Sequence, residues 1–327
     1  MKKPGFAFQK VDYYYYQVYQ DGMWQDPIFS TSSSFEIAMS STSLHYGQQA
    51  FEGMKAFRGD DQKIRLFRPL ENAKRFRQSC YKMMMPEVSD AHFLKAITDT
   101  ILKNQSYVPQ KDYNQSLYVR PYMIGVGDNM GLRPASSYIF GVVVTPVGSY
   151  FDGETAGKYL IASEDRVAPN GTGPYKVGGN YGAVLRTQFE AKQQGYMDAL
   201  FLDPKTNTKI DEFGGANIFF IKDHTYITPD SPTILKSITN DSLIQFAALR
   251  GLKIEKRDVY ITELHTFSEA AACGTAASVS PIGSITYNKE VIHISDTIGP
   301  ITKQLRLDLL ETQYGDKEDT LGFVYFV

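Results

Sequence analysis

The sequence is poor in cysteine and histidine. Cys80 and Cys273 are the only cysteines among 327 residues, and no Cys-x-x-Cys spacing occurs. This excludes a disulfide framework and a cysteine-rich zinc site, so we expect both thiols to be buried without a chemical role. The five histidines are scattered without the i, i+4 spacing of a zinc-binding helix. The sequence therefore predicts no metal site.

The sequence also lacks an excess of one charge and a long apolar run. It has 34 Lys+Arg against 36 Asp+Glu, and no basic stripe is present. Nucleic acid is therefore not expected as a partner. No stretch approaches the roughly 20 apolar residues of a membrane span, and the N-terminal residues lack the apolar region of a signal peptide. We predict a soluble, cytoplasmic protein that does not bind a membrane.

Common motifs of nucleotide-binding proteins and hydrolases are absent. The glycines of residues 125–131 and 171–179 match neither G-x-G-x-x-G nor the phosphate-loop pattern. No G-x-S-x-G elbow occurs, so serine hydrolysis has no signature here. Residues with a chemical role are therefore expected in other segments.

The length and the periodicity predict two domains of α+β structure, because 327 residues exceed the usual size of a single hydrophobic core. Apolar residues recur at helical spacing in five segments: 72–85, 91–102, 181–194, 241–250 and 298–310. Short β-rich runs lie at 13–16, 64–67, 117–124, 138–144, 199–202, 218–221 and 226–228. A turn-rich stretch follows Val144. We therefore expect domains at 1–147 and 157–327, joined by a linker at 148–156.

Lys176 lies in a glycine-rich loop, between Gly171-Thr-Gly173 and Gly178-Gly179. The missing side chains would let a planar group approach the backbone. A lysine that forms a Schiff base needs a desolvated amine and a neighbour that controls its protons, and Tyr181 follows five residues later. A solvated lysine and a packed tyrosine would give the same pattern. The loop by itself leaves both alternatives open.

Two further segments suggest a cofactor. Glu212 precedes a glycine turn that leads into an apolar strand, and a carboxylate there can keep a pyridine nitrogen protonated. A turn carboxylate in water is the simpler alternative. Ser237-Ile-Thr239 precedes the helix expected at 241–250, and such a helix N-terminus can bind phosphate. N-capping by Thr239 explains the same residues equally well.

Six sequence segments, taken together in their order along the chain, favour a functional interpretation of these features. They are LHYGQQAFEGMKAFRG (44–59), LFRPLENAKRFRQS (66–79), SLYVRPYMIG (116–125), KVGGNYG (176–182), DEFGGANIFF (211–220) and ACGTAASVSPIG (272–283). Together they resemble the branched-chain amino acid aminotransferases, and the likeness continues to residues 312–315. The resemblance implies a two-domain, pyridoxal phosphate fold of type IV, like that of D-amino acid aminotransferase. The N-terminal α/β domain would be the smaller one.

The resemblance assigns roles to individual residues. Lys176 would form the internal aldimine with pyridoxal 5′-phosphate and move the substrate proton, Glu212 would contact the pyridine nitrogen, and Tyr181 the ring oxygen. The phosphate would be held by Arg75, by the amides of Ile238 and Thr239 and by the hydroxyl of Thr275. The turn at Thr275 and Ala276 would also receive the substrate carboxylate. The side-chain pocket would be formed by Tyr46, Phe51, Tyr118, Arg120 and Tyr150.

Four departures from the family pattern are visible. Leu235-Lys-Ser237 stands where many members have Leu-Pro-Gly, and Asn240 stands at a common arginine position. Residues 277–280 lack the redox Cys-x-x-Cys of some animal members, so thiol regulation is not expected. Gly215 replaces a threonine that the animal enzymes have near the cofactor ring.

Arg120 is expected to take part in substrate recognition. In the reaction that the resemblance implies, one pocket must accept both the apolar branch of leucine and the side-chain carboxylate of glutamate. Tyr118 and Arg120 are two apart in an expected strand and so point to one face, where tyrosine rings can cover the guanidinium. Apart from the resemblance, a structural ion pair of Arg120 on an outer face is the simpler interpretation.

The expected reaction is reversible amino transfer between Leu, Ile or Val and 2-oxoglutarate, carried out by a homodimer that binds small amino acids and 2-oxo acids. A D-amino acid aminotransferase and an aminodeoxychorismate lyase share the fold, but the LYVRP string at 117–121 argues against both. A non-catalytic binding protein with a decayed pocket is a third alternative. The joint presence of Lys176, Glu212 and Arg75 argues against decay.

Overall fold

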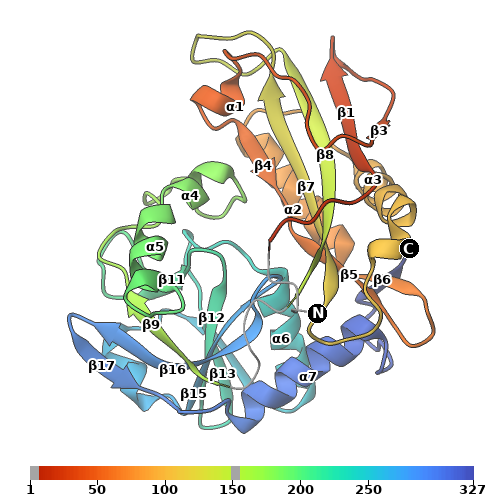
Figure 1. Cartoon of the computed structure of the whole chain (residues 1–327). Coiled ribbons are helices and arrows are strands. Elements are labelled where there is room, and N and C mark those ends of the chain that lie inside the picture. The colour runs from red at the N-terminus through yellow and green to blue at the C-terminus, as the bar shows by residue number, and fades with distance from the viewer. Residues whose placement is uncertain (1–6, 149–154) are drawn as a thin grey trace. The chain divides into compact units, whose positions relative to one another are not determined.

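The computed structural model describes residues 7–148 and 155–327. The chain divides into a first unit, Met1–Ser149 with Tyr175–Gly179 and Glu311–Val327, and a second unit, Tyr150–Pro174 with Asn180–Leu310 (Figure 1). Most of the expected linker lies outside the described residues. The segments Tyr175–Gly179 and Glu311–Val327, which the sequence analysis placed in the second domain, cluster with the first unit. Short stretches like these carry no periodicity that would reveal where they pack.

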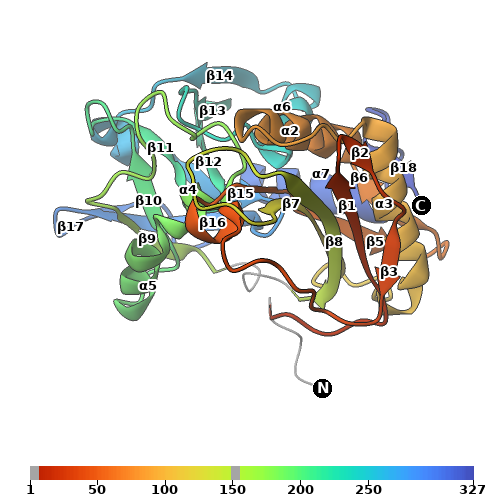
Figure 2. The same cartoon turned by 90° about the horizontal axis from the view of Figure 1, so that it is seen from above.

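The first unit is built on a mainly antiparallel sheet, in which β3 and β4 lie off the order β18-β6-β5-β7-β8-β1-β2. Its strands are β1 Tyr14–Gln20, β2 Met23–Trp24, β3 Ile28–Ser30, β4 Gln49–Phe51, β5 Met54–Arg58, β6 Ile64–Phe67, β7 Ser116–Val126, β8 Ser137–Val147 and β18 Val324–Phe326. The hairpin of β7 and β8 pairs Ser116 with Val147 and Val126 with Ser137. Figure 2 shows β18 beside β6, so the last strand of the chain completes the edge of the first unit.

Two helices cover one face of this sheet, α2 Pro69–Lys82 and α3 Asp90–Lys103. Helix α2 begins at a proline, which suits the first turn, and α3 is capped by Ser89, whose side chain accepts from the backbone N–H of His92. Both helices were expected within a few residues of these bounds. Phe76 of α2 and Phe93 of α3 meet Phe140 of β8 in the core. The unit also contains α1 Thr42–His45 and the 3₁₀ turn η1 Gln105–Tyr107.

The second unit contains a mixed sheet of order β11-β10-β9-β16-β15-β12-β13-β14, with β17 paired to β16. Its strands are β9 Gly157–Ile161, β10 Ala199–Leu202, β11 Ile210–Phe213, β12 Asn217–Lys222, β13 Thr225–Pro229, β14 Lys253–Arg257, β15 Glu269–Gly274, β16 Ser278–Tyr287 and β17 Glu290–His293. The expected strands at 199–202, 218–221 and 226–228 are confirmed as β10, β12 and β13. Strands β15 and β16 were not expected. The small residues of 270–273 lack the β-branched and aromatic signal, and Pro281 and Gly283 interrupt the run of β16.

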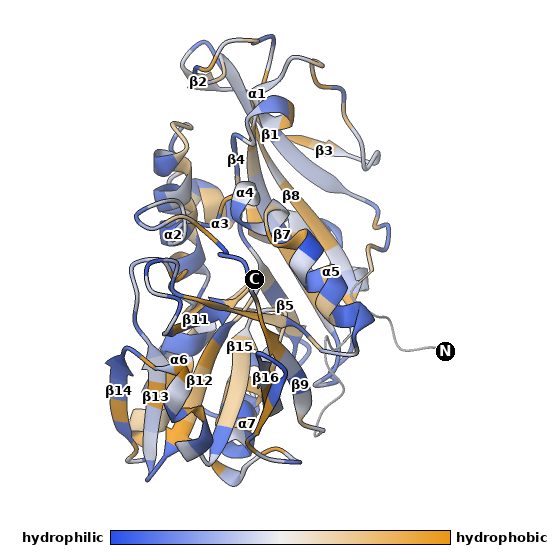
Figure 3. Cartoon of the chain, turned by 90° about the vertical axis from the view of Figure 1, so that its left-hand side faces the viewer, coloured by the Kyte–Doolittle hydropathy of each residue, from blue (hydrophilic) through white to orange (hydrophobic). Residues whose placement is uncertain are grey.

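The remaining helices are α4 Gly178–Gly182, α5 Leu185–Gln193, α6 Ile238–Leu249 and α7 Pro300–Tyr314, with the 3₁₀ turn η2 Ile261–Thr266. The prediction of a single helix at 181–194 is wrong in one respect, because the chain forms two helices, α4 and α5, with a break after Gly182. Figure 3 shows α5 as largely hydrophilic, while β12 is largely hydrophobic and is buried along most of its length. Buried Glu269 accepts hydrogen bonds from the backbone N–H groups of Ile301 and Thr302, and so caps α7.

Cys80 and Cys273 are buried and unpaired, as expected. Within the described residues, no helix is long and apolar enough to cross a bilayer, and no group of three His, Cys, Asp or Glu side chains is arranged to hold a metal.

Candidate active site

Lys176 is held in the first unit by backbone pairing. Ala50 and Val177 form an antiparallel bridge, and the N–H of Phe51 donates to the carbonyl of Lys176 at 3.1 Å. The N–H of Lys176 donates to Ser79 Oγ at 2.9 Å. These contacts fix the backbone on both sides of the lysine and place its Nζ 4.9 Å from the ring centroid of Phe51. The side chain therefore lies against an aromatic face, which disfavours the alternative of a freely solvated loop lysine.

A buried carboxylate supports Arg75. Glu52 has a fully buried side chain, and Arg75 binds it through Nε at 2.7 Å and Nη2 at 2.8 Å. Asn72 adds a hydrogen bond at 2.8 Å to Glu52 Oε2. Burial alone would raise the pKa of Glu52, but the charge and hydrogen bonds of Arg75, with the charge of Lys176, hold that pKa below its ordinary value. We call Glu52 and Arg75 the first pair.

The sequence prediction named Arg75 but missed its partners. Asn72, Arg75 and Ser79 stand at i, i+3 and i+7 of α2, so they form a polar stripe on one face of the helix. Asn72 and Ser79 are both buried. A polar stripe at this spacing in an otherwise amphipathic helix was the available signal. Glu52, the one acidic residue within the run AFEGMKAF, was another.

Tyr118 and Arg120 share one face of β7, as expected. Arg120 Nη2 donates to the hydroxyl of Tyr118 at 2.8 Å, and the guanidinium lies 4.7 Å from the ring centroid of Phe51 and 5.2 Å from that of Tyr118. Gly53 permits this packing, because a Cβ there would overlap the Tyr118 hydroxyl. Arg120 Nε is buried and has no hydrogen-bond partner among the described residues. The aromatic cover of the guanidinium is present, and its substrate role stays a prediction.

The other expected pocket residues are less informative. Tyr46 is exposed, and its hydroxyl donates to the carbonyl of Met130 at 2.8 Å. Tyr150 lies outside the described residues. The structure therefore brings Phe51, Tyr118 and Arg120 into contact, and the pocket role of Tyr46 stays a prediction.

Glu212 lies on β11 in the second unit, where only 3% of its surface is exposed. Its Oε1 accepts from the N–H of Leu235 at 2.8 Å and pairs with Arg166 Nη2 at 2.7 Å, while Oε2 accepts from Asn217 Nδ2 at 2.8 Å. The alternative of a turn carboxylate in water is therefore wrong. We call Arg166 and Glu212 the second pair. The sequence prediction missed Arg166, which lies in an aperiodic loop, and no local signal marks it.

Helix α6 presents its N-terminus in the same unit. Ser237, and not Thr239, is the N-cap, since its Oγ accepts from the N–H of Asn240. Ile238 and Thr239 occupy the first two helical positions, whose N–H groups have no acceptor within the helix. Asn240 is buried, accepts from the hydroxyl of Tyr226 at 2.6 Å and donates to Thr228 Oγ1. This buried network explains why asparagine suits a position where arginine is common.

Thr275 and Ala276 lie in the tight turn between β15 and β16. The turn is closed by pairing of Gly274 with Ser278, and Ser278 has a positive φ of 52°. Ser278 Oγ is buried without a hydrogen-bond partner in the described part of the chain. An unsatisfied hydroxyl beside turn amides is typical of a place where a polar ligand group is missing.

Comparison with known proteins decides the family. The model of the amino-transferase class IV family matches residues 49–285. The chain belongs to the class IV aminotransferases. The branched-chain-amino-acid aminotransferase of Helicobacter pylori J99 is 45% identical to this chain, and the alignment covers 100% of this chain and 97% of that protein. Its counterpart in Haemophilus influenzae is 43% identical over 98% of this chain and 96% of its own length.

Solved structures agree with this class IV assignment. The branched-chain amino acid aminotransferase of Escherichia coli superimposes with a TM-score of 0.82 at 28% identity, over 96% of this chain and 99% of that one. The T.th. branched-chain amino acid aminotransferase complexed with N-(5′-phosphopyridoxyl)-L-glutamate gives a TM-score of 0.80 at 25% identity, over 97% of this chain and 99% of that one. The expected fold type IV is confirmed.

The described residues of this class IV aminotransferase fit a phosphorylated pyridine ligand. The second unit offers helix N–H groups at Ile238 and Thr239, an unsatisfied hydroxyl at Ser278 and the carboxylate of Glu212. A Cβ placed on Gly215 would meet nothing within 4 Å, so the backbone after Glu212 borders open space. The second unit therefore contains a helix N-terminus of the kind that suits an anion and a carboxylate of the kind that suits a ring N–H.

The glycines near Lys176 serve more than one purpose. A Cβ on Gly173 would overlap the carbonyl of Thr233, so close backbone packing, and not approach of a planar group, requires this glycine. A Cβ on Gly178 would overlap Gln49, whereas one on Gly179 meets nothing within 4 Å. The idea that all these glycines make room for a ligand is therefore wrong for Gly173.

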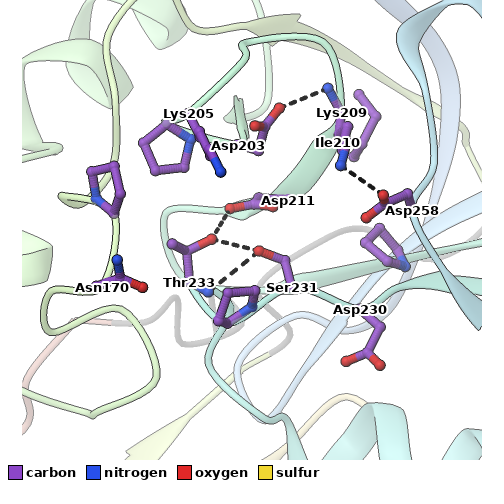
Figure 4. Close-up of a pocket in the computed structure, with 14 residues that line it drawn as sticks. Asn170, Asp203, Lys205, Lys209, Ile210, Asp211, Asp230, Ser231, Thr233 and Asp258 are labelled. Carbon is purple, nitrogen blue, oxygen red and sulfur yellow. Dashed lines mark hydrogen bonds and ion pairs between the residues drawn. The ribbon is translucent and has the colours of Figure 1, made fainter.

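A pocket of about 370 Å³ lies in the second unit of this aminotransferase (Figure 4). Its lining includes Asp203, Asp211, Thr233 and Asp258. Asp203 is satisfied by backbone N–H groups, and Asp258 is paired with Lys209. The hydroxyl of Thr233 donates to Asp211, and its carbonyl accepts from Arg166 at 2.6 Å. Thr233 thus connects the pocket wall to the second pair.

Proposed function

We propose that this class IV aminotransferase, with pyridoxal phosphate as its cofactor, catalyses reversible amino transfer between Leu, Ile or Val and 2-oxoglutarate. The observation that carries the proposal is the full-length similarity, at 43–45% identity, to two branched-chain-amino-acid aminotransferases. The residue types at the candidate site support the same chemistry.

The bound cofactor supplies an electron sink that stabilises negative charge at the substrate α-carbon. We assign Lys176 Nζ to covalent attachment of the cofactor and to carrying the α-proton away and back. The backbone bonds of Lys176 to Phe51 and Ser79 restrict the range of the amine. The aromatic ring of Phe51 shields it from water on one side.

Two charged groups are assigned to opposite ends of the cofactor. The carboxylate of Glu212 would accept a hydrogen bond from the pyridine N–H and favour the protonated ring. Arg75, the first turn of α6 and Thr275 would each supply donors for the phosphate, a combination of charge-assisted and helix-terminus bonds. Tyr181 is assigned to the ring oxygen, and the N–H groups of Thr275 and Ala276 to the substrate carboxylate.

Substrate choice is assigned to Arg120 under its aromatic cover. The rings of Phe51 and Tyr118 would present an apolar surface to leucine, while Arg120 Nε, which has no partner in the part of the chain that the structure describes, is assigned to the side-chain carboxylate of glutamate. A buried carboxylate without such a donor would be strongly disfavoured. Tyr46 and Tyr150 stay in the proposal as further pocket residues.

Purified holoenzyme should form glutamate from L-leucine and 2-oxoglutarate, and the Lys176→Ala variant should not. Borohydride reduction followed by peptide mapping should place the cofactor on Lys176, with Lys192→Ala as a control that keeps the label. Activity only with D-amino acids, or pyruvate release from aminodeoxychorismate, would assign the chain to another class IV reaction. A label on another lysine would remove Lys176 from the site.

Homodimer formation and a cytoplasmic location belong to the same proposal. Light scattering of the purified protein should give twice the mass of 36.8 kDa. Fractionation of cells should place the activity in the cytosolic fraction. A monomeric active enzyme, or activity in a membrane fraction, would contradict these two points.

A further inference from the structure

Arg166 is a buried arginine in the loop after β9, and its side chain is 6% exposed. Its Nη2 pairs with Glu212 at 2.7 Å and donates to the carbonyls of Thr233, at 2.6 Å, and Gly173, at 3.3 Å. A charged side chain is rarely buried to this extent unless it is paired. Because Arg166 pairs with the carboxylate that is assigned to the cofactor ring, the ion pair indicates a role beyond folding.

We propose that Arg166 is a positioning residue that keeps Glu212 ionised and correctly oriented for the cofactor. This inference rests on the role of Glu212 under the proposed function. Arg166 itself contacts Glu212 and backbone carbonyls, and it acts through Glu212.

Leu235, Asn217 and Arg166 bind Glu212 with different effects. Leu235 N–H and Asn217 Nδ2 are neutral, and each binds a different carboxylate oxygen, so together they fix the plane of the carboxylate. Arg166 differs from them because it brings positive charge. A carboxylate buried to this degree without a cation takes up a proton, because burial disfavours the charged form. A neutral carboxyl group would no longer favour a protonated pyridine nitrogen.

Arg166 is fixed in turn by the segments around it. Because a Cβ on Gly173 would overlap the carbonyl of Thr233, the close approach of these two backbones depends on glycine. Figure 4 shows Thr233 between Asp211 and Ser231, and its hydroxyl donates to Asp211. The guanidinium thus cannot turn away from Glu212 without breaking bonds to two carbonyls.

Arg166 acts on two acidic side chains, Glu212 and Asp211. Asp211 precedes Glu212 in β11, and burial raises its pKa, while the Thr233 hydrogen bond and, more weakly, the charge of Arg166 oppose the rise. Asp203 also acts on Asp211, in the direction that raises its pKa. Only Glu212 forms an ion pair with Arg166 among the described residues. A test must therefore separate Glu212 from Asp211.

The first test uses the apoprotein, so that it does not depend on catalysis. Removing one member of a buried pair leaves an uncompensated charge, and Arg166→Met should lower the midpoint of thermal unfolding by roughly 5–10 °C. The double variant Arg166→Met/Glu212→Gln should recover much of this loss. Arg186→Met removes an exposed arginine from its pair with Glu190 and should shift the midpoint by no more than about 1 °C.

The result of this double-mutant cycle of Arg166 and Glu212 either supports or overturns the proposal. If Arg166 only tethers Thr233 and Gly173, Glu212→Gln will not rescue Arg166→Met, and the proposal fails. Rescue by Asp211→Asn instead of Glu212→Gln would assign the charge of Arg166 to Asp211 and would also overturn it.

A pH series adds a second readout. In Arg166→Met the pKa of Glu212 should rise above its value in the unfolded chain, so the native state holds the extra proton. Stability then falls as pH increases from about 4.5 toward 7. The double variant should lack this additional slope. Parallel stability profiles of Arg166→Met and the double variant would contradict the proposal.

The holoenzyme provides the functional readout. Arg166→Met should lower kcat at least about tenfold, with a smaller change in KM, and Arg166→Lys should restore part of the loss because it keeps the charge. A change confined to KM would overturn the proposal. If Glu212→Gln itself is fully active, the assigned role of Glu212 fails, while the apoprotein cycle still reports whether Arg166 and Glu212 are coupled.

Discussion

The two units contain the same chemical pair with the assignments reversed. In the first pair, the carboxylate of Glu52 is fully buried, and Arg75, with 12% of its side chain exposed, is the member assigned to the ligand. In the second pair both side chains are enclosed, and the carboxylate of Glu212 is the member assigned to the ligand. The charge of the ligand group decides which member of each pair is assigned to it, since a phosphate needs a cation and a pyridinium needs an anion. The other member of the pair stabilises that buried charge.

The largest effect should come from removing the supporting carboxylate of the first pair. Glu52→Leu leaves Arg75 without its partner, and the free energy of unfolding should fall by about 3–5 kcal/mol in urea titration. The lowered pKa of Glu52 means that its contribution is present above the unfolded-state value and is lost as pH falls through the folded-state value. The difference between wild type and variant should therefore shrink in acid. An unchanged difference at pH 4 and pH 7 would show that packing, and not charge, matters at Glu52.

Removing the arginine of the first pair should affect the cofactor most. Arg75→Ala should weaken pyridoxal phosphate binding by about 2–5 kcal/mol, because a charge-assisted bond to phosphate is lost. Fluorescence titration of the folded apoprotein measures this. Arg77→Ala is the matched control on the same helix, since Arg77 pairs with Asp90 at the surface. Equal affinities in the two variants would remove Arg75 from the phosphate site.

Substitution in the second pair should affect turnover more than cofactor binding. Glu212→Gln should keep most of the cofactor affinity and lose about 100-fold in kcat, roughly 2.7 kcal/mol, because a neutral amide does not favour the protonated ring. Steady-state kinetics with Glu190→Gln as an exposed control measures the loss. Full activity would mean that Glu212 serves only to join β11 to Arg166, Asn217 and Leu235.

The smallest effect should be a change in substrate preference. Arg120→Met should raise the KM for glutamate or 2-oxoglutarate about tenfold, which corresponds to roughly 1.4 kcal/mol, and should change the KM for leucine less. Separate half-reactions give the two values. Tyr118→Phe keeps the aromatic cover and removes only the hydroxyl, so it should leave leucine unaffected. Equal losses for both substrates would place Arg120 outside the substrate site.

Sequence reasoning succeeded where the pattern of an element is local. The helix at 69–82 carries its own periodicity, although the polar stripe that contains Arg75 was not recognised in it. The same reasoning failed for Arg166, whose partner Glu212 is 46 positions away and is reached through a loop without periodicity. It also failed for β15, whose small residues give little strand signal, and for β16, whose run is interrupted by Pro281 and Gly283. Contacts between distant segments depend on the fold, and a single sequence does not display them.

Strand β18 has a consequence for how the chain is made. Its residues, Val324–Phe326, pair with β6, and the first unit also needs Tyr175–Gly179, which bridges to Ala50. During synthesis, the edge of the first sheet must wait until residues 324–326 have left the ribosome. Truncation after residue 310 should therefore damage the unit that was synthesised first. Cutting the chain near residue 150 should not release two pieces that each fold alone.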